Sequence, residues 1–161
     1  MVAPISYRLA GPDDAPEIVA VIHRGFAQYG GKLAPPSGAL GETVATVAER
    51  LGDERCIVAL DGASLIGCVF YEVRDKEVYF SRLAVLPDYR GRGLARRLIA
   101  EVEAAARAAR IAAVTLGVRI ALTDNIAFFA ALGYREISRH AHPGFSQPTS
   151  LTMEKRLDAT T

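Results

Sequence analysis

The sequence contains little cysteine, no excess of charge of either sign and no long hydrophobic run. Its two cysteines, Cys56 and Cys68, follow neither a metal-binding nor a redox spacing, so we expect two small buried side chains and no disulfide framework. The 19 basic and 18 acidic residues leave a net charge of +1, which argues against a protein that coats nucleic acid. No apolar stretch is long enough to cross a membrane.

The beginning of the chain and its length further limit the classes of protein that the sequence can represent. The start, MVAPISYRLAGPDD, lacks the basic-then-apolar pattern of a signal peptide. The length of 161 residues suits one domain with one core, and we find no repeat, low-complexity tract or internal linker. We therefore expect a single domain over residues 1–161 of a cytoplasmic protein that binds neither membranes nor nucleic acid.

Hydrophobic periodicity predicts an alternation of strands and helices. The expected strands are 5–9, 56–60, 64–73, 77–86, 112–118, 135–141 and 149–157. Four helices are expected. The first is capped by Asp13 or Asp14, the second covers 39–51 and the third covers 93–109. The fourth lies in 123–134 and ends at Gly133. The strands within 56–86 are separated by short turns and should form an antiparallel meander. This order predicts one mixed α/β sheet.

Residues 87–98, PDYRGRGLARRL, place two glycines and several arginines at the start of an expected helix. Glycine weakens a helix start, and positive charge there opposes the helix dipole, so a bound anion should offset both costs. Helix N-termini bind anions through unpaired N–H groups, and arginine adds charge-assisted hydrogen bonds. A solvated surface turn is the alternative, but the position between a strand and a helix favours a cradle for phosphate or pyrophosphate.

Two common phosphate-binding motifs do not match this loop. A Walker loop ends in Gly-Lys-Ser/Thr, which is absent, and a dinucleotide fingerprint needs a third glycine where this chain has Arg96. The sequence therefore gives poor support for ATP or a dinucleotide as the ligand.

On these residues the chain resembles the GNAT superfamily of acyl-CoA-dependent N-acetyltransferases. The family motif Gln/Arg-x-x-Gly-x-Gly/Ala is matched by Arg90, Gly93 and Ala95, with the common extra glycine at Gly91. The order of elements fits along nearly the whole chain, including the PDDAPEI start and the FFAALGY helix. The resemblance implies an α/β (α+β) fold with a mixed, mostly antiparallel sheet of about seven strands flanked by about four helices.

The resemblance also implies acetyl-CoA as co-substrate, with no metal. The diphosphate would lie on the loop residues Arg90, Gly91, Arg92, Gly93, Leu94 and Ala95. The fourth strand would bulge near Leu83–Val85 and separate from the fifth, and pantetheine would bind the backbone of Leu83, Ala84 and Val85. Asn125 would contact pantetheine or make local backbone bonds at the helix start, and Phe129 stands where many relatives have a tyrosine acid.

The implied reaction is direct attack of an amine on the thioester, which needs a base or a water relay for the amine proton. Many relatives carry a carboxylate on the fourth strand near Ser81 or Arg82, and this chain has none there. Glu72 is the nearest acidic candidate for the base, with a solvated strand glutamate as the alternative. Tyr71 faces the opposite side, so only one of the two neighbours can point into the cleft.

Candidates for acceptor binding are Arg82 and Tyr71. Arg82 would be costly to bury unpaired, so it either forms a salt bridge or binds a carboxylate or phosphate of the ligand. His140 and His142 either line the acceptor mouth or are solvated, and His23 is expected to be structural. By elimination the acceptor is a small or amino-acid-like amine. A non-catalytic acyl-CoA-binding module is the alternative, and a homodimer is compatible with the sequence.

Overall fold

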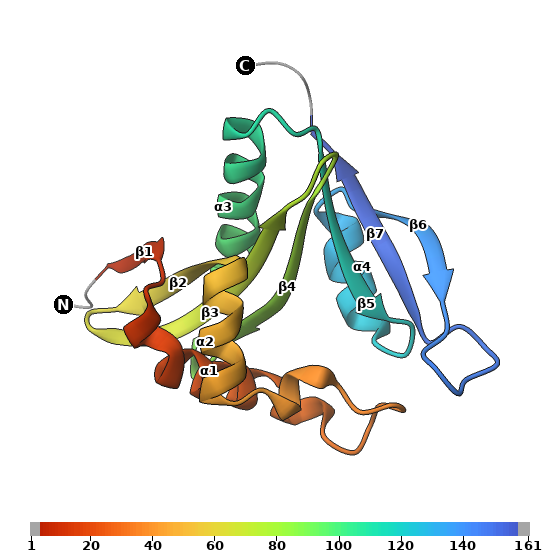
Figure 1. The fold of residues 1–161 in the computed structure, drawn as a ribbon, viewed down its shortest axis with the longest axis horizontal. Coiled ribbons are helices and arrows are strands. Elements are labelled where there is room, and N and C mark those ends of the chain that lie inside the picture. The colour runs from red at the N-terminus through yellow and green to blue at the C-terminus, as the bar shows by residue number, and fades with distance from the viewer. Residues whose placement is uncertain (1–3, 158–161) are drawn as a thin grey trace.

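The computed structural model describes residues 4–157, which form one seven-stranded sheet with helices on both faces (Figure 1). The strands are β1 Ile5–Leu9, β2 Arg55–Asp61, β3 Ser64–Val73, β4 Val78–Val85, β5 Ala113–Arg119, β6 Arg135–His140 and β7 Ser150–Arg156. The helices are α1 Ala15–Phe26, α2 Val44–Asp53, α3 Leu94–Ala108 and α4 Thr123–Ala131. The strand order β1-β2-β3-β4-β5-β7-β6 confirms the predicted mixed sheet.

Strands β2, β3 and β4 form the expected antiparallel meander. The pairing of β4 with β5 is parallel, while the remaining pairs in the sheet are antiparallel. A parallel neighbour requires a crossover connection, and α3 provides it between β4 and β5. The start of α3 therefore lies directly after the end of β4, which is where the glycine–arginine loop occurs.

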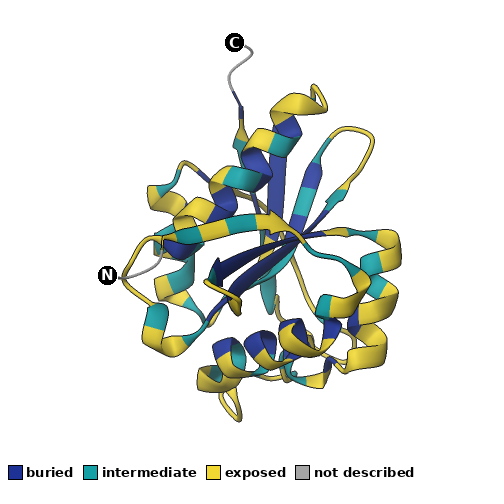
Figure 2. Cartoon of the chain, turned by 90° about the vertical axis from the view of Figure 1, so that its left-hand side faces the viewer, coloured by how far each residue is buried: buried dark blue, intermediate teal, exposed yellow. Residues whose placement is uncertain are grey.

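The central strands β2, β3 and β4 are largely buried on both faces, and their side chains alternate between two apolar layers (Figure 2). Tyr71 and Phe80 belong to the layer covered by α3, whereas Phe70 belongs to the layer covered by α1 and α2. Cys56 and Cys68 are free and buried in this second layer, which confirms their expected role as small apolar side chains. A hydrogen bond with Cys68 and, next to it, burial raise the pKa of the Cys56 thiol, so it stays protonated.

The second helix begins later than the sequence predicted. We expected a helix over 39–51, but Gly38–Gly41 form a short 3-10 helix and α2 begins only after Thr43. The Thr43 hydroxyl accepts the N–H of Thr46, and the Thr46 hydroxyl accepts the N–H of Thr43. This reciprocal capping prevents the helix from extending backwards. As a result Glu42 precedes α2 and its carboxylate reaches β4.

The first helix begins near the predicted caps. Asp14 directly precedes α1, yet its carboxylate does not cap that helix. It accepts the N–H of Gly11 and pairs with Arg8 at 2.8 Å.

Within residues 4–157, no helix is both long and apolar enough to span a bilayer.

Candidate active site

The parallel contact between β4 and β5 is short. It covers only Val78–Phe80 on β4 and Val114–Leu116 on β5, and the two strands then diverge, as Figure 1 shows. A β-bulge occurs at the point of divergence: Cys68 is paired with Ala84 and Phe70 with Ser81, so two residues of β4 oppose one of β3. Such a bulge disrupts the ladder and bends the strand.

The two β4 residues of the bulge, Arg82 and Leu83, lie opposite the single residue Val69, and Arg82 has a left-handed backbone with φ of 54°. A non-glycine residue rarely adopts this conformation, so tertiary contacts must hold it. The resemblance implied a bulge near Leu83–Val85, and the structure places it at Arg82 and Leu83.

The divergence of the strands opens a cleft with a volume of about 560 Å³. One end is lined by α1, β4, the start of α3 and α4, and its residues include Gly25, Ala84, Val85, Arg90, Ala95, Leu122, Asn125 and Phe129. The other end is lined by the segment after α1, the end of β5 and the β6–β7 loop, and its residues include Leu33, Ser37, Gly38, Arg82, Arg119, His142 and Ser150. Below, these are the cradle end and the loop end.

The glycine–arginine loop lies at the cradle end. Gly91 and Gly93 have φ of 77° and 81°, and Gly93 is the residue directly before α3. A side chain at either position would meet no atom within 4 Å, so glycine is required here by backbone conformation and not by crowding. Among residues 4–157, no protein group accepts the N–H groups of residues 91–93. The first turn of α3 adds further unpaired N–H groups.

Arg90 fixes this loop to the rest of the cleft. Its Nη2 donates to the carbonyl of Gly25, near the end of α1, at 2.9 Å. α1 can approach β4 closely because residue 25 is glycine: a Cβ there would lie 3.0 Å from the Cβ of Ala84. Leu94, which follows the loop, is buried in the core and anchors the first turn of α3. The open N–H groups and the neighbouring guanidinium together fit a diphosphate.

Asn125 and Phe129 both line the cleft on α4. The Asn125 amide contacts the Tyr29 hydroxyl across the cleft, at 3.1 Å from Nδ2. Its side chain therefore does not make the local helix-start bonds that were one of its two interpretations. Phe129 is 8% exposed and packs edge-to-face on Phe80 and Tyr134, forming an apolar wall. Tyr134 is buried, as expected for a core aromatic.

Glu72 and Tyr71 lie outside the cleft lining. Glu72 sits near the exposed end of β3 and pairs with Arg74 at 3.3 Å. Tyr71 is 6% exposed and packs in the layer under α3. The structure places neither neighbour in the cleft, because the cleft opens beside β4 and β5 and not beside the end of β3. Among the described residues that line the cleft there is no aspartate or glutamate.

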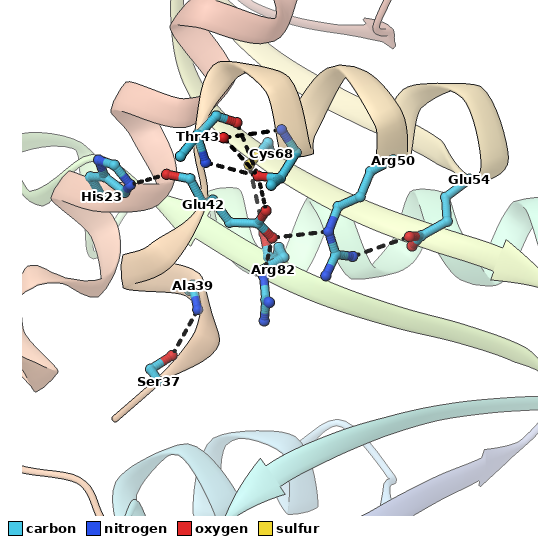
Figure 3. Close-up of polar contacts among 10 residues, drawn as sticks. His23, Ser37, Ala39, Glu42, Thr43, Arg50, Glu54, Cys68 and Arg82 are labelled. Carbon is cyan, nitrogen blue, oxygen red and sulfur yellow. Dashed lines mark hydrogen bonds and ion pairs between the residues drawn. The ribbon is translucent and has the colours of Figure 1, made fainter. Parts of the chain in front are cut away.

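Arg82 is at once an ion-pair residue and a cleft residue (Figure 3). Its Nε donates to Glu42 Oε2 at 2.8 Å, and Arg50 Nε donates to the same oxygen at 2.9 Å. The other oxygen of Glu42 accepts the Thr46 hydroxyl at 2.6 Å. Burial alone would raise the pKa of Glu42, but the hydrogen bonds from Thr46 and Arg82 and the charge of Arg50 lower it. Glu42 is therefore a carboxylate at neutral pH and holds Arg82 at the bulge.

Sequence reasoning did not single out Arg119. It ends β5, and its Nη2 donates to the carbonyls of Pro35 and Pro36 at 2.6 and 3.1 Å. Partial burial lowers its pKa, although the guanidinium remains charged at any physiological pH. In the sequence, Arg119 is recognisable only as a cation at the end of an otherwise apolar strand. An arginine at a solvated strand end gives the same pattern, so the sequence alone does not identify Arg119 as a cleft residue.

His142 lies in the cleft, whereas His140 does not line it. The Nδ1 atom of His142 is hydrogen bonded to the Thr149 hydroxyl. Partial burial, the charge of Arg119 and the neighbouring His140 lower the pKa of His142 from its ordinary value of 6.5, so the ring is neutral at pH 7. His23 bonds to the Glu42 carbonyl at 2.7 Å, which confirms its structural role.

The comparisons with known proteins agree with this fold and site. The sequence model of the Acetyltransferase (GNAT) family matches residues 32–134, and the chain belongs to this family. The chain is thus an acyltransferase, and acetyl-CoA fits the cleft as its co-substrate. No curated protein sequence is significantly similar to it.

Solved structures show the same fold. A PaiA N-acetyltransferase from Thermoplasma acidophilum in complex with coenzyme A has a TM-score of 0.79 at 17% identity, covering 95% of this chain and 99% of that one. The ribosomal-protein-S18-alanine N-acetyltransferase from Escherichia coli has a TM-score of 0.78 at 18% identity, covering 98% and 97%. A ribosomal-protein-alanine N-acetyltransferase from Brucella melitensis has a TM-score of 0.74 at 20% identity, covering 94% and 99%.

Proposed function

We propose that this chain, as one domain over residues 1–161, transfers the acetyl group of acetyl-CoA to the amine of a small or amino-acid-like acceptor. The observation that carries the proposal is the cleft between β4 and β5, with a bulge in its wall and the open N–H groups of the glycine–arginine loop at one end. These features suit an elongated ligand that has an anion at one end.

The chain's own residues would hold the coenzyme in two ways. The open N–H groups of residues 91–95 and the Arg90 guanidinium would bind the diphosphate. The bulge frees backbone groups of Leu83, Ala84 and Val85 from the β4–β5 ladder, and these would bind pantetheine as an added strand does. Asn125 and Phe129 would form the opposite wall, with the Asn125 amide available for a polar contact and Phe129 for an apolar one.

In the reaction the acceptor nitrogen forms a bond to the thioester carbonyl carbon, and the carbon–sulfur bond then breaks. The nitrogen loses one proton, and the thiolate of coenzyme A leaves and takes up a proton from solvent. Because a thiol has a pKa of about 8.5, the thiolate leaves without a dedicated acid. Phe129 at the position of the usual acid is therefore compatible with turnover.

We assign the proton-accepting role to His142 and not to Glu72. Among the described residues that line the cleft, His142 is the side chain that is neutral at pH 7 and able to take a proton. Glu72 is directed to the surface and to Arg74. An amine bound near His142 can pass its proton to Nε2 directly or through one water.

The first test is calorimetric titration with acetyl-CoA, with ATP as control, followed by turnover on a panel of amines. We expect one-site binding of acetyl-CoA, no binding of ATP, and release of free thiol that depends on an added amine. Binding without turnover of any amine would favour a non-catalytic acyl-CoA-binding module. Absence of acetyl-CoA binding would remove the proposed function altogether.

Replacement of His142 by glutamine is expected to lower kcat/KM about 100-fold at pH 7, at the low end for loss of a general base because water can partly replace it. The pH profile gives the sharper test. Since the pKa of His142 is depressed, the wild-type profile should lose one unit of slope above an inflection below pH 6.5, where the ring becomes neutral. The His142→Gln profile should lack that inflection. A profile that keeps it would exclude His142, and His140→Gln serves as the matched control.

A further inference from the structure

The charged side chains that line the cleft are all cationic among residues 4–157. They are Arg82, Arg90 and Arg119, from β4, the glycine–arginine loop and β5. Arg90 lies at the cradle end, where the diphosphate supplies its counter-charge under the proposed function. The other two lie at the loop end, where the acceptor must enter. A positive charge there that no carboxylate balances repels a polyamine or any other polycation.

Arg82 and Arg119 differ in how their charges are balanced. The Glu42 carboxylate neutralises Arg82, whose Nε lies 2.8 Å from Glu42 Oε2. Arg50 pairs with both Glu42 and Glu54, so the network adds one further positive and one further negative charge. No carboxylate within residues 4–157 pairs with Arg119, whose hydrogen bonds go to two main-chain carbonyls. The loop end of the cleft thus holds one uncompensated positive charge.

The Arg119 guanidinium also has donors to spare. Both carbonyl contacts use Nη2, so the N–H groups of Nη1 and Nε have no acceptor among the described residues. The side chain is held in place by the segment after α1 and is partly buried, which lowers its pKa. A partly desolvated cation with free donors, fixed in position, is a binding site for a carboxylate.

We propose that the acceptor is an amine that carries a carboxylate close to its nitrogen, as an amino acid does, and that Arg119 binds this carboxylate. The inference rests on the proposed acetyltransferase function and specifies its acceptor. Arg82, held by Glu42, lines the same end of the cleft and contributes further N–H donors.

The same charge arrangement assists the reaction. An ammonium group that enters a cleft lined by cations and lacking carboxylates loses its proton more readily, since nearby positive charge disfavours the protonated form. With the carboxylate on Arg119, the adjacent nitrogen would share the loop end of the cleft with His142, whose neutral ring can accept the proton. The positive charge therefore selects the acceptor and makes its amine nucleophilic.

The test compares the twenty L-amino acids with the corresponding L-amino acid amides and with putrescine, at saturating acetyl-CoA. Rates are expressed per concentration of neutral amine, because an amide lowers the amine pKa. We expect at least one amino acid to be acetylated with a KM about 10- to 50-fold below that of its amide, as expected for charge-assisted hydrogen bonds. Arg119→Gln should raise the amino-acid KM by the same factor, change the amide KM much less and leave acetyl-CoA affinity unchanged, while Arg119→Lys should restore part of the difference.

Three results would overturn the inference. Amides or putrescine acetylated as well as the amino acids would remove the carboxylate requirement while leaving the acetyltransferase function intact. An equal loss for amino acid and amide in Arg119→Gln would mean that Arg119 only supports the Pro35–Pro36 segment. If acetyl-CoA binds but no amine of the panel is acetylated, both the inference and the proposed function fail.

Discussion

Replacement of Gly93 by glutamate is expected to weaken acetyl-CoA binding by at least about 1,000-fold, because several hydrogen bonds to a charged diphosphate are lost together. Gly93 has φ of 81° and directly precedes α3, so the new side chain both strains the backbone and places a carboxylate where the diphosphate should lie. Calorimetric titration with acetyl-CoA measures the loss.

Two further variants separate strain from charge in this prediction. Gly62→Glu adds the same side chain at φ of 62°, also in open space, but in the β2–β3 turn, so it should keep full affinity. Gly93→Ala keeps the strain without the charge and should lose much less affinity than Gly93→Glu. Unchanged affinity in Gly93→Glu would mean that the glycine–arginine loop is an ordinary surface turn.

Replacement of Glu42 by glutamine is expected to lower the free energy of unfolding by about 2 kcal/mol at pH 7. The change leaves the Arg82 and Arg50 guanidinium groups facing each other without their shared carboxylate. Breaking a fully buried ion pair costs about 3–5 kcal/mol, and the cost here is smaller because both arginine side chains retain contact with water. Urea unfolding measures the effect, with the exposed-pair variant Glu101→Gln as control.

The pH dependence of this difference identifies its cause. The pKa of Glu42 is lowered below its ordinary value of 4.5 in the folded protein. Its stabilising contribution is therefore fully present above that ordinary value and is lost as the pH falls through the lowered one. The gap between wild type and Glu42→Gln should close over this acidic range. A difference in unfolding free energy that stays constant down to pH 3 would show that the altered shape of the side chain, and not its lost charge, causes the destabilisation.

Glu42→Gln also reports on the cleft. Arg82 occupies a left-handed conformation at the bulge, and its ion pair with Glu42 is one of the contacts that hold it there. We expect the variant to lose acetyl transfer more than acetyl-CoA binding, since Arg82 lies at the loop end and the residues proposed to bind the diphosphate lie at the cradle end.

The sequence predicted most elements of the fold because their causes are local. Apolar runs separated by short turns identified β2, β3 and β4, and the glycine–arginine loop identified the start of α3. The start of α2 was placed wrongly, since the 3-10 helix at Gly38–Gly41 and the mutual capping of Thr43 and Thr46 are not visible in hydrophobic periodicity. The side chains of Tyr71 and Glu72 were predicted to point to opposite faces of the sheet, but neither lines the cleft.

The sequence by itself determined the β2–β3–β4 meander, the strand–loop–helix unit and the glycines that open its backbone, because each depends on residues close together in the chain. Only the tertiary structure decided which charges meet. Arg82 pairs with Glu42 across 40 positions, and Arg119 reaches the Pro35 carbonyl across 84. These contacts depend on how α2 and the segment after α1 pack against diverging strands. Nothing in a local pattern records that packing, and so the acceptor end of the cleft appeared only with the fold.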